Sequence, residues 1–508
     1  MPFDSEFKKS EILELGTRRI TPDIVNRVAQ GEMAVKLSSR LRELMFRTHK
    51  ILEKKVSSGM PIYGINLGVG YLSEMPVAGN QVDAFQERLI LSHAVGVGEE
   101  LSCEECRAII FQSANSLSLG TSGVRPEVVN FLLELLNRDI TPCVPSFGSV
   151  GSSGDLVPLA HIALSFLKKG YMIKEGKKRQ TDEVLKEADL YPPTLLHKEG
   201  LALINGTHAM AGIGALEVER FSYLCNVADL VAACSMEALG VSTLPFNQAV
   251  MNFRPHPGQC RVAKNLIRFL KGSKAVNSSD RHQDAFSLRC TPQVHGAVRD
   301  TLDYAQSVLT VELNSCTDNP AIDPISGEIY TTGNFHGEPL AFVFDYLAIA
   351  AAELGSLSER RINNLLSGYA SHLPLFLTPH PDSNTGYMII QYTAVSLLGE
   401  MKVLARPAST DSFSLSLGKE DHVSMGWGAI RKLKRSLNNL EMVLALELLC
   451  AIQGINLRYP IKLGLHTDLV CRAVKGLILP VGVDSYHGDE LKAVNSFLKN
   501  RNAIRELL

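Results

Sequence analysis

The sequence predicts a mainly α-helical fold built around long helices, and three observations support this. Helical periodicity with an apolar face runs through much of the second half, over 208–239, 301–313, 340–366, 387–404 and 420–457. Several helix starts in the first half carry capping signals, such as Thr21-Pro22-Asp23 and Ser102 with Glu105 three residues later. A helix over 420–457 would be about 57 Å long at 1.5 Å per residue. Helices this long and apolar need other helices around them, from the same chain or from neighbouring subunits.

Taken in order, the first half alternates helices with loops. Helices are predicted from Thr21 to a stop at Gly31, over 36–55, 82–93, 102–119 and 126–136, and from Leu156 to Gly170, with a glycine-rich loop at 61–70. A charged segment at 174–189 predicts a surface excursion with a short hairpin at Glu175-Gly176. The change from a loop-rich to a helix-rich composition predicts an N-terminal part over 1–200 and a long helical bundle over 201–508, which is also compatible with one continuous body.

Composition indicates an ordinary soluble globular protein. The 508 residues carry a net charge of -2, with 45% hydrophobic and 20% charged residues, so no strong field favours nucleic acid or an anionic membrane as a partner. The segment 1–14 lacks the apolar core of a signal peptide, and no apolar run looks long enough to span a membrane. We therefore expect a cytoplasmic protein whose ten cysteines are reduced thiols. Cys103 and Cys106 fall in the first turn of a capped helix, and no metal site is predicted.

The stretch Gly148-Ser149-Val150-Gly151-Ser152-Ser153-Gly154-Asp155 precedes the helix predicted from Leu156, with Asp155 as its expected cap. A glycine-rich loop before a helix is typical of phosphate binding. Gly154-Asp155-Leu156 lacks the lysine of a Walker loop, however, and two prolines in 141–145 interrupt the strand that a dinucleotide fingerprint needs. A nucleophile elbow needs a glycine two residues before Ser153, which is also absent.

Several long motifs, spread from residue 63 to the region of residue 420, resemble the histidine ammonia-lyase branch of the aromatic amino acid lyase family. They are Tyr63-Gly64-Ile65-Asn66, Leu91-Ser92-His93-Ala94, Ser152-Ser153-Gly154, Asn205-Gly206-Thr207, Gln283–Arg289, Thr317–Pro320, Gly333–Pro339 and Glu420–Met425. The resemblance implies a mainly helical homotetramer in which each active site draws residues from three subunits and acts on a small amino acid.

The resemblance also implies a self-made prosthetic group, 4-methylidene-imidazol-5-one, formed from Ser152-Ser153-Gly154 without an external cofactor. In this chemistry the amide nitrogen of Gly154 attacks the carbonyl of residue 152, and Ser153 loses its hydroxyl as water. The family usually has alanine where this chain has Ser152. Only the backbone carbonyl of that residue enters the ring, so closure is expected if the Ser152 hydroxyl is accommodated.

By the same resemblance, Tyr63 removes the β-proton, and the position of Phe286 belongs to the catalytic set. A tyrosine base would need its pKa lowered, and a lowering of three units corresponds to about 4 kcal/mol. The substrate-binding set that the resemblance implies is His93 and Glu420 for an imidazole, Arg289 for the carboxylate, Asn205 and Gln283 for the ring or substrate, and Asn319 and Phe335 as pocket lining.

Three departures from the family pattern keep alternatives open. Phe286 stands where the family has a catalytic tyrosine, His208 where it has glutamine, and Lys419 where another glutamine is usual. The leading hypothesis is elimination of ammonia from L-histidine to give trans-urocanate. The alternatives are a related lyase or aminomutase on a modified histidine or another aromatic amino acid, and a non-catalytic relative used for binding or assembly.

Overall fold

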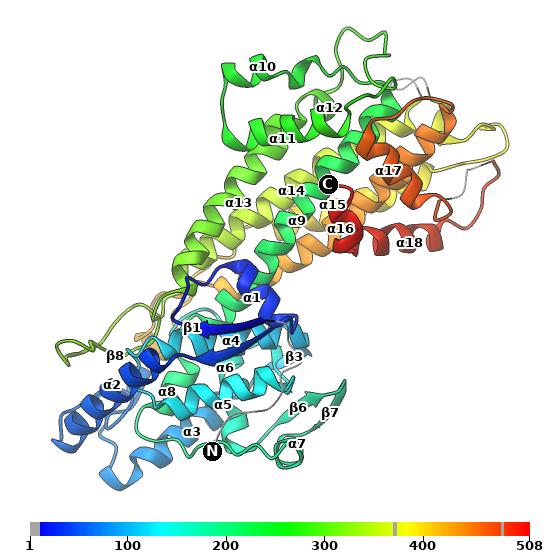
Figure 1. Cartoon of the computed structure of the whole chain (residues 1–508). Coiled ribbons are helices and arrows are strands. Elements are labelled where there is room, and N and C mark those ends of the chain that lie inside the picture. The colour runs from blue at the N-terminus through cyan, green and yellow to red at the C-terminus, as the bar shows by residue number, and fades with distance from the viewer. Residues whose placement is uncertain (1–10, 369–372, 479–481) are drawn as a thin grey trace. The chain divides into compact units, whose positions relative to one another are not determined.

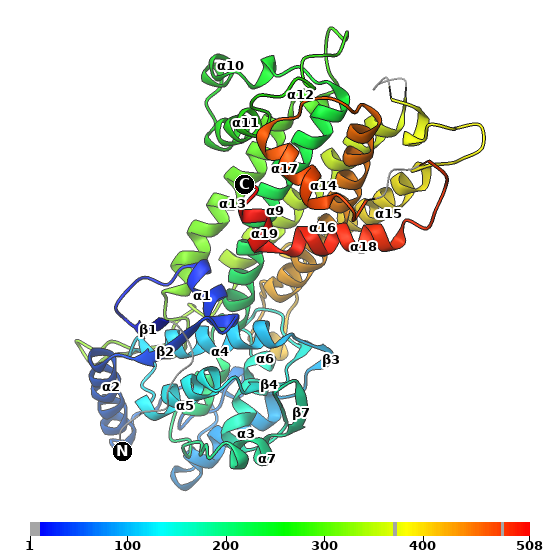
Figure 2. The ribbon, with the colours of Figure 1, turned by 45° about the vertical axis from the view of Figure 1, so that its right-hand side comes forward.

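The computed structural model describes residues 11–368, 373–478 and 482–508, and Figures 1 and 2 trace the chain from two directions. Its internal contacts divide it into two units. Unit 1 comprises Met1–Glu219, Gln306–Phe344 and Pro407–Ile430, and unit 2 comprises Arg220–Ala305, Asp345–Arg406 and Arg431–Leu508. These units interleave along the sequence. The division into 1–200 and 201–508 follows composition instead, and it stays a prediction.

The mainly α-helical prediction is confirmed. The helices are α1 (Pro22–Ala29), α2 (Ser39–Ser57), α3 (Val82–His93), α4 (Cys103–Ser118), α5 (Pro126–Asn137), α6 (Val157–Ala163), α7 (Thr181–Glu187), α8 (Glu199–Ile204), α9 (His208–Leu239), α10 (Gln248–Phe253), α11 (Pro257–Phe269), α12 (Phe286–Arg289), α13 (Thr291–Leu313), α14 (Glu338–Leu366), α15 (Met388–Leu404), α16 (Gly426–Leu457), α17 (Leu465–Val474), α18 (Gly488–Lys499) and α19 (Arg501–Arg505). Both views show α9, α13, α14 and α16 running side by side (Figures 1 and 2). Leu437, Leu440 and Leu444 of α16 are fully buried, as expected of a core helix.

The strands that the structure describes are short and belong to unit 1. They are β1 (Glu11–Leu15), β2 (Met33–Leu37), β3 (Val97–Glu100), β4 (Thr141–Pro142), β5 (Pro145–Phe147), β6 (Tyr171–Lys174), β7 (Lys177–Gln180), β8 (Ala321–Ile322) and β9 (Ile329–Tyr330). β1 and β2 pair in parallel, with residue 11 opposite residue 33, and the helix α1 connects them. The other pairs are antiparallel, including the β6–β7 hairpin predicted at Glu175-Gly176.

Two capping signals in the first half of the chain placed helix starts correctly. The Thr21 side chain accepts a hydrogen bond from Ile24 N at the start of α1. Ser102 and Glu105 form the expected reciprocal box at the start of α4, which places Cys103 in its first turn. All ten cysteines are free thiols, which agrees with the reduced state predicted from the sequence.

Three predicted helix boundaries were wrong. α13 starts ten residues earlier than expected, because Pro292 lies in its first turn, where the missing N–H costs nothing. α16 starts at Gly426 and not at Glu420, because Glu420 pairs through its backbone with Leu415 in a non-helical segment. α6 ends at Ala163 and continues only as a 3-10 turn.

The expectation that no apolar run is long enough to span a membrane was also wrong, when length and apolarity are the only criteria. Among the described helices, α14 and α16 are long and apolar enough to cross a bilayer. In their most apolar windows, however, 67% and 83% of the residues are buried within the protein. Such burial is typical of the core helices of soluble proteins.

Candidate active site

Unit 1 contains a cavity of about 160 Å³ that collects most of the predicted site residues. Those that line it are Tyr63, His93, Ser153, Asn205, Asn319, Phe335 and Glu420. The remaining lining is largely apolar, from Val69, Leu89, Leu156, Leu201 and Ile204, with Gly70 and Ser416. These residues come from stretches of chain up to more than 350 positions apart. The fold therefore brings together side chains that belong to separate sequence motifs.

The loop that carries Ser153 into this cavity is held by backbone contact between two glycines. Gly154 forms a parallel bridge with Gly206, and Asp155 N donates to Gly206 O at 2.8 Å. A Cβ added at Gly154 would lie 2.1 Å from Gly206 O, and φ at this residue is +77°. No side chain fits there, so the fold requires glycine at position 154, as the expected ring formation does.

The two serines before Gly154 also fit the predicted group. Ser153 lines the cavity in the left-handed region at φ +54°, a conformation that costs energy outside glycine. Ser152 is buried, and its hydroxyl donates to Glu420 Oε2 at 3.1 Å. The departure from alanine is therefore accommodated, because the extra hydroxyl has a hydrogen-bond acceptor in the site.

Asp155 does not cap α6 as predicted. The N-cap position of α6 is Leu156, which makes no side-chain capping bond. Instead, Asp155 Oδ2 accepts hydrogen bonds from Ala209 N at 2.7 Å and Met210 N at 3.0 Å, at the start of α9. The carboxyl is fully buried, and burial raises its pKa to about 7 in spite of these two donors. Asp155 thus ties the Ser152–Gly154 loop to α9, 54 residues away.

Tyr63 points its hydroxyl at the backbone, where it accepts from Gly70 N at 3.1 Å. Burial raises the pKa of Tyr63, the Gly70 hydrogen bond opposes this, and the negative charge of Glu420 adds to the increase. The lowered pKa that a tyrosine base needs is therefore not provided by the surrounding groups of the free chain.

His93 ends α3, and its ring nitrogens have distinct roles. Nδ1 lies 2.7 Å from Leu89 O, a carbonyl that can only accept, so Nδ1 carries the hydrogen. In the neutral ring Nε2 is then left with a lone pair. With Glu420 in the same cavity, the site offers hydrogen-bond acceptors for the N–H groups of an imidazole.

Asn205 and Asn319 are held by a buried charged pair. Asn205 Nδ2 donates to Asn319 O at 2.8 Å, while Asn319 N donates to Asp318 Oδ1 at 2.7 Å. Asp318 is buried in an ion pair with Lys198. These bonds fix the Asn205 side chain and the Asn319 backbone at the cavity wall, while Asn319 Oδ1 accepts a hydrogen bond from Thr332 N at 2.7 Å.

Gln283, Phe286 and Arg289 belong to unit 2 and are not among the residues that line the cavity. Gln283 is exposed and Phe286 is 69% exposed. Arg289 is half-buried, with its guanidinium carbon 4.8 Å from the centre of the Phe286 ring. Lys419 is exposed and does not line the cavity, so it does not place a positive charge directly on the cavity wall.

The sequence flagged His208 only as a departure, and its structural role was missed. The side chain is fully buried, and neither ring nitrogen has a hydrogen-bond partner among the described residues. Its Nε2 would lie 2.9 Å from a Cβ added at Gly206. Burial lowers the pKa of His208 to about 4, so the ring packs against Gly206 as a neutral group.

His336, Glu338 and His422 lie close enough together to raise the question of a metal site. Glu338 N donates to Nδ1 of His336 at 3.3 Å, and Nε2 of His336 lies 3.2 Å from Nδ1 of His422. In the neutral ring Nε2 of His336 is then the protonated nitrogen, which donates to His422. If Nε2 of His336 bound a metal, the ring hydrogen would have to be on Nδ1, where it would face the N–H of Glu338. We therefore assign His336 and His422 as a hydrogen-bonded pair.

Comparisons with known proteins give the same family by sequence and by fold. The family model described as aromatic amino acid lyase matches residues 20–475. Histidine ammonia-lyase of Deinococcus radiodurans is 45% identical over 482 residues, which are 94% of this chain and 92% of that protein. The crystal structure of histidine ammonia-lyase from Trypanosoma cruzi matches with a TM-score of 0.90 at 35% identity, covering 98% of this chain and 95% of that one. Tyrosine aminomutase from Streptomyces globisporus matches with a TM-score of 0.92 at 35% identity, covering 97% and 98%.

Proposed function

Because this chain belongs to the aromatic amino acid lyase family, we propose that it eliminates ammonia from L-histidine to give trans-urocanate. The observation that carries the proposal is the single cavity in which Ser153, Tyr63, His93 and Glu420 meet. The first two residues are suited to the elimination and the last two to an imidazole side chain.

The proposed prosthetic group forms from Ser152-Ser153-Gly154. The Gly154 amide nitrogen bonds to the carbonyl carbon of Ser152, whose oxygen leaves as water, and Ser153 loses its hydroxyl and an α-hydrogen as a second water. Three features support this assignment: Gly154 has no Cβ, its backbone is in close contact with Gly206, and Ser153 has a left-handed backbone conformation. The finished group would supply an electrophile facing the cavity.

The residues of the chain then bind and orient the substrate. Glu420 accepts a hydrogen bond from one imidazole nitrogen, and Ser152 holds that carboxylate in place. His93, with its hydrogen on Nδ1, offers Nε2 as a second acceptor. Two acceptors suit an imidazolium better than a phenol or phenyl ring, which supports histidine as the substrate class.

Tyr63 is proposed to accept the β-proton at its hydroxyl oxygen. Burial and Glu420 keep this group protonated in the free chain, so the phenolate must form after substrate binds. The ammonium of bound histidine adds a positive charge to the cavity, and positive charge lowers the pKa of a phenol. The hydrogen bond from Gly70 N favours the same ionised form.

None of the residues that line the cavity in the described part of the chain is lysine or arginine. A substrate carboxylate there needs a cation from elsewhere, and we assign this role to Arg289, with Gln283 as a further contact. The homotetramer implied by the family resemblance provides several copies of Arg289.

We infer that this homotetrameric enzyme is cytoplasmic.

A second candidate, aminomutase activity on an aromatic amino acid, is favoured by the equal sequence identity to a tyrosine aminomutase structure. One assay separates the two. Purified chain is incubated with L-histidine, L-tyrosine or L-phenylalanine, and urocanate, ammonia and β-amino acids are quantified. We expect urocanate and ammonia in equal amounts from L-histidine only, and neither from Ser153→Ala. A β-amino acid without ammonia would support the aminomutase, and no product from any substrate would contradict both.

A further inference from the structure

The short helix α12 has two different faces. Ser287 and Leu288 are buried, whereas Phe286 is exposed and carries the Arg289 guanidinium over its ring. Nε of Arg289 is buried without a hydrogen-bond partner among the described residues. Arg289 is therefore held mainly by packing on Phe286, with hydrogen-bonding capacity left unused.

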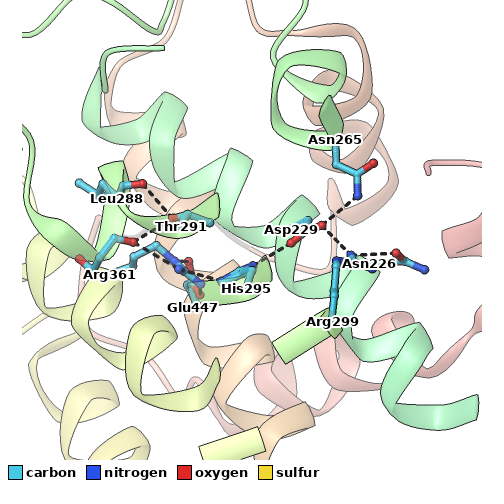
Figure 3. Close-up of polar contacts among 10 residues, drawn as sticks. Asn226, Asp229, Asn265, Leu288, Thr291, His295, Arg299, Arg361 and Glu447 are labelled. Carbon is cyan, nitrogen blue, oxygen red and sulfur yellow. Dashed lines mark hydrogen bonds and ion pairs between the residues drawn. The ribbon is translucent and has the colours of Figure 1, made fainter. Parts of the chain in front are cut away.

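The buried face of α12 is bonded to α14 and α13. Asn364 Nδ2 donates to Ser287 Oγ at 3.0 Å, and Arg361 Nη1 donates to Ser287 O at 3.4 Å. Thr291 Oγ1 lies 3.1 Å from Ser287 O and 2.8 Å from Leu288 O. Figure 3 shows the hydrogen bond between Thr291 and Leu288, with Arg361 nearby. Both backbone and side-chain groups of α12 are thus hydrogen-bonded to residues of α13 and α14.

The anchor continues into a buried charged network. Arg361 and Glu447 are fully buried and form a two-pronged pair, at 2.6 Å from Nε and 2.9 Å from Nη2. Ser235 and Ser358 also donate to Glu447. This carboxylate is therefore surrounded by donors, and it fixes the Arg361 fork in one orientation.

On its other side the network reaches Asp229 through His295 (Figure 3). Nδ1 of His295 lies 2.7 Å from Asp229 Oδ1, and its Nε2 lies 3.4 Å from Arg361 Nη1. Burial lowers the pKa of His295, so the neutral ring donates to Asp229 and accepts from Arg361. Arg299 pairs with Asp229 at 2.6 Å, so two carboxylates balance two guanidinium groups.

Burying four charges is a poor way to gain stability, since a well-packed apolar cluster of similar volume often does as well. A saturated network is better suited to holding one geometry. Beside this network, α12 presents the Arg289 guanidinium, whose Nε has no hydrogen-bond partner among the described residues. We propose that the network and Phe286 act together to position Arg289, so that it meets the substrate carboxylate in a single orientation. This inference rests on the proposed role of Arg289.

The division of labour follows from the chemistry of arginine. A planar guanidinium binds a carboxylate by two parallel hydrogen bonds, which fail if the plane is turned. The Phe286 ring, 4.8 Å from the guanidinium carbon, limits how far the Arg289 side chain can turn. Asn364 and Arg361 hold the helix that carries both side chains. All three are positioning residues in this account.

Asn364→Ala and Asn363→Ala form a matched pair that tests the anchor. The two asparagines are adjacent on α14 and similarly half-buried, but Asn363 bonds to Gln391 and not to α12. KM and kcat for L-histidine are measured, together with the inhibition constant of histamine, which has the imidazole and ammonium but no carboxylate. We expect Asn364→Ala to raise KM for histidine about tenfold, with histamine inhibition unchanged. We expect Asn363→Ala to change neither value.

Equal KM values in the two variants, or a parallel weakening of histamine, would overturn the proposal. Phe286→Leu, which removes the ring, should raise KM for L-histidine in the same way and leave histamine inhibition unchanged. If wild-type chain makes no urocanate, the proposed function fails. Calorimetric titration of L-histidine and histamine into the asparagine variants then still decides whether Asn364 acts through the carboxylate.

Discussion

The cavity of unit 1 and the α12 region of unit 2 are built by opposite means. The cavity is fixed by backbone contact, where Gly154 pairs with Gly206 and leaves no room for a Cβ. The α12 region is fixed by side chains, through saturated pairs such as Arg361 with Glu447. A side chain added at Gly154 would disrupt the whole backbone contact at once, whereas the side-chain hydrogen bonds of the α12 region can be removed one at a time. Substitutions that break the glycine contact in the first region should abolish activity, whereas single side-chain substitutions in either region should change activity by degrees.

The largest effect should come from Gly154→Ala. A Cβ there would collide with Gly206 O at 2.1 Å, so the ring should not close and kcat should fall by at least about 10³-fold. Mass spectrometry and the histidine assay measure both consequences. Gly79→Ala is the control, because nothing lies within 4 Å of a Cβ at that position. An active Gly154→Ala protein would contradict the claim that activity requires a glycine in contact with Gly206.

Phe286→Tyr should give the next largest effect, as a gain. The family hydroxyl would be restored on an exposed ring that already lies beside Arg289. We expect kcat to rise by about 10²-fold, the usual scale for a positioned proton donor. An unchanged kcat would show that this chain does its chemistry without a hydroxyl at position 286.

Ser152→Ala should have a moderate effect that separates ring formation from substrate binding. Only the Ser152 carbonyl enters the ring, so the mass should still report ring formation. Loss of the hydrogen bond to Glu420 Oε2 should raise KM for histidine by about threefold to tenfold. Failure of the ring to form in this variant would mean that the serine is required for the cyclisation itself.

The smallest effects concern stability against pH, where Asp155 and His208 oppose each other. The folded pKa of Asp155, about 7, lies above its unfolded value, so its stabilising contribution is lost as pH rises from about 4 to 7. The folded pKa of His208, about 4, lies below its unfolded value, so its contribution is lost as pH falls from about 6.5 to 4. Each slope is at most about 1.4 kcal/mol per pH unit.

Melting temperatures between pH 4.5 and 6.5 test this opposition. Asp155→Asn should make stability rise more steeply with pH than in the wild type, because only the His208 slope remains. His208→Gln should make it flatter or falling. Parallel curves for the two variants would contradict the assignment of these protonation states.

The sequence predicted local features well because their causes are local. The cap at Thr21, the box at Ser102 and the β6–β7 hairpin all depend on residues within a few positions of one another. The start of α16 was misplaced because 420–425 has helical periodicity, while its actual conformation is set by pairing of Glu420 with Leu415 and a left-handed Met425.

Long-range features could not be derived from local patterns. Asp155 looked like the cap of the helix beside it, but it caps α9 from 54 residues away. Arg361 and Glu447 are 86 residues apart, and neither stands in a recognisable motif. Of the site residues that the family resemblance implies, Tyr63, His93, Asn205 and Glu420 line the cavity, whereas Gln283, Phe286 and Arg289 do not, and their roles stay predictions. It did not indicate the Ser152 to Glu420 hydrogen bond, which arises from a departure in this chain.

The most direct test of the central claim is the intact mass of the purified, denatured wild-type chain, measured beside Ser153→Ala. We expect a wild-type mass below the sequence mass by two water molecules, about 36 Da, and no such combined loss in Ser153→Ala. A wild-type chain at its full sequence mass would contradict the claim that Ser152-Ser153-Gly154 is the precursor of an electrophile.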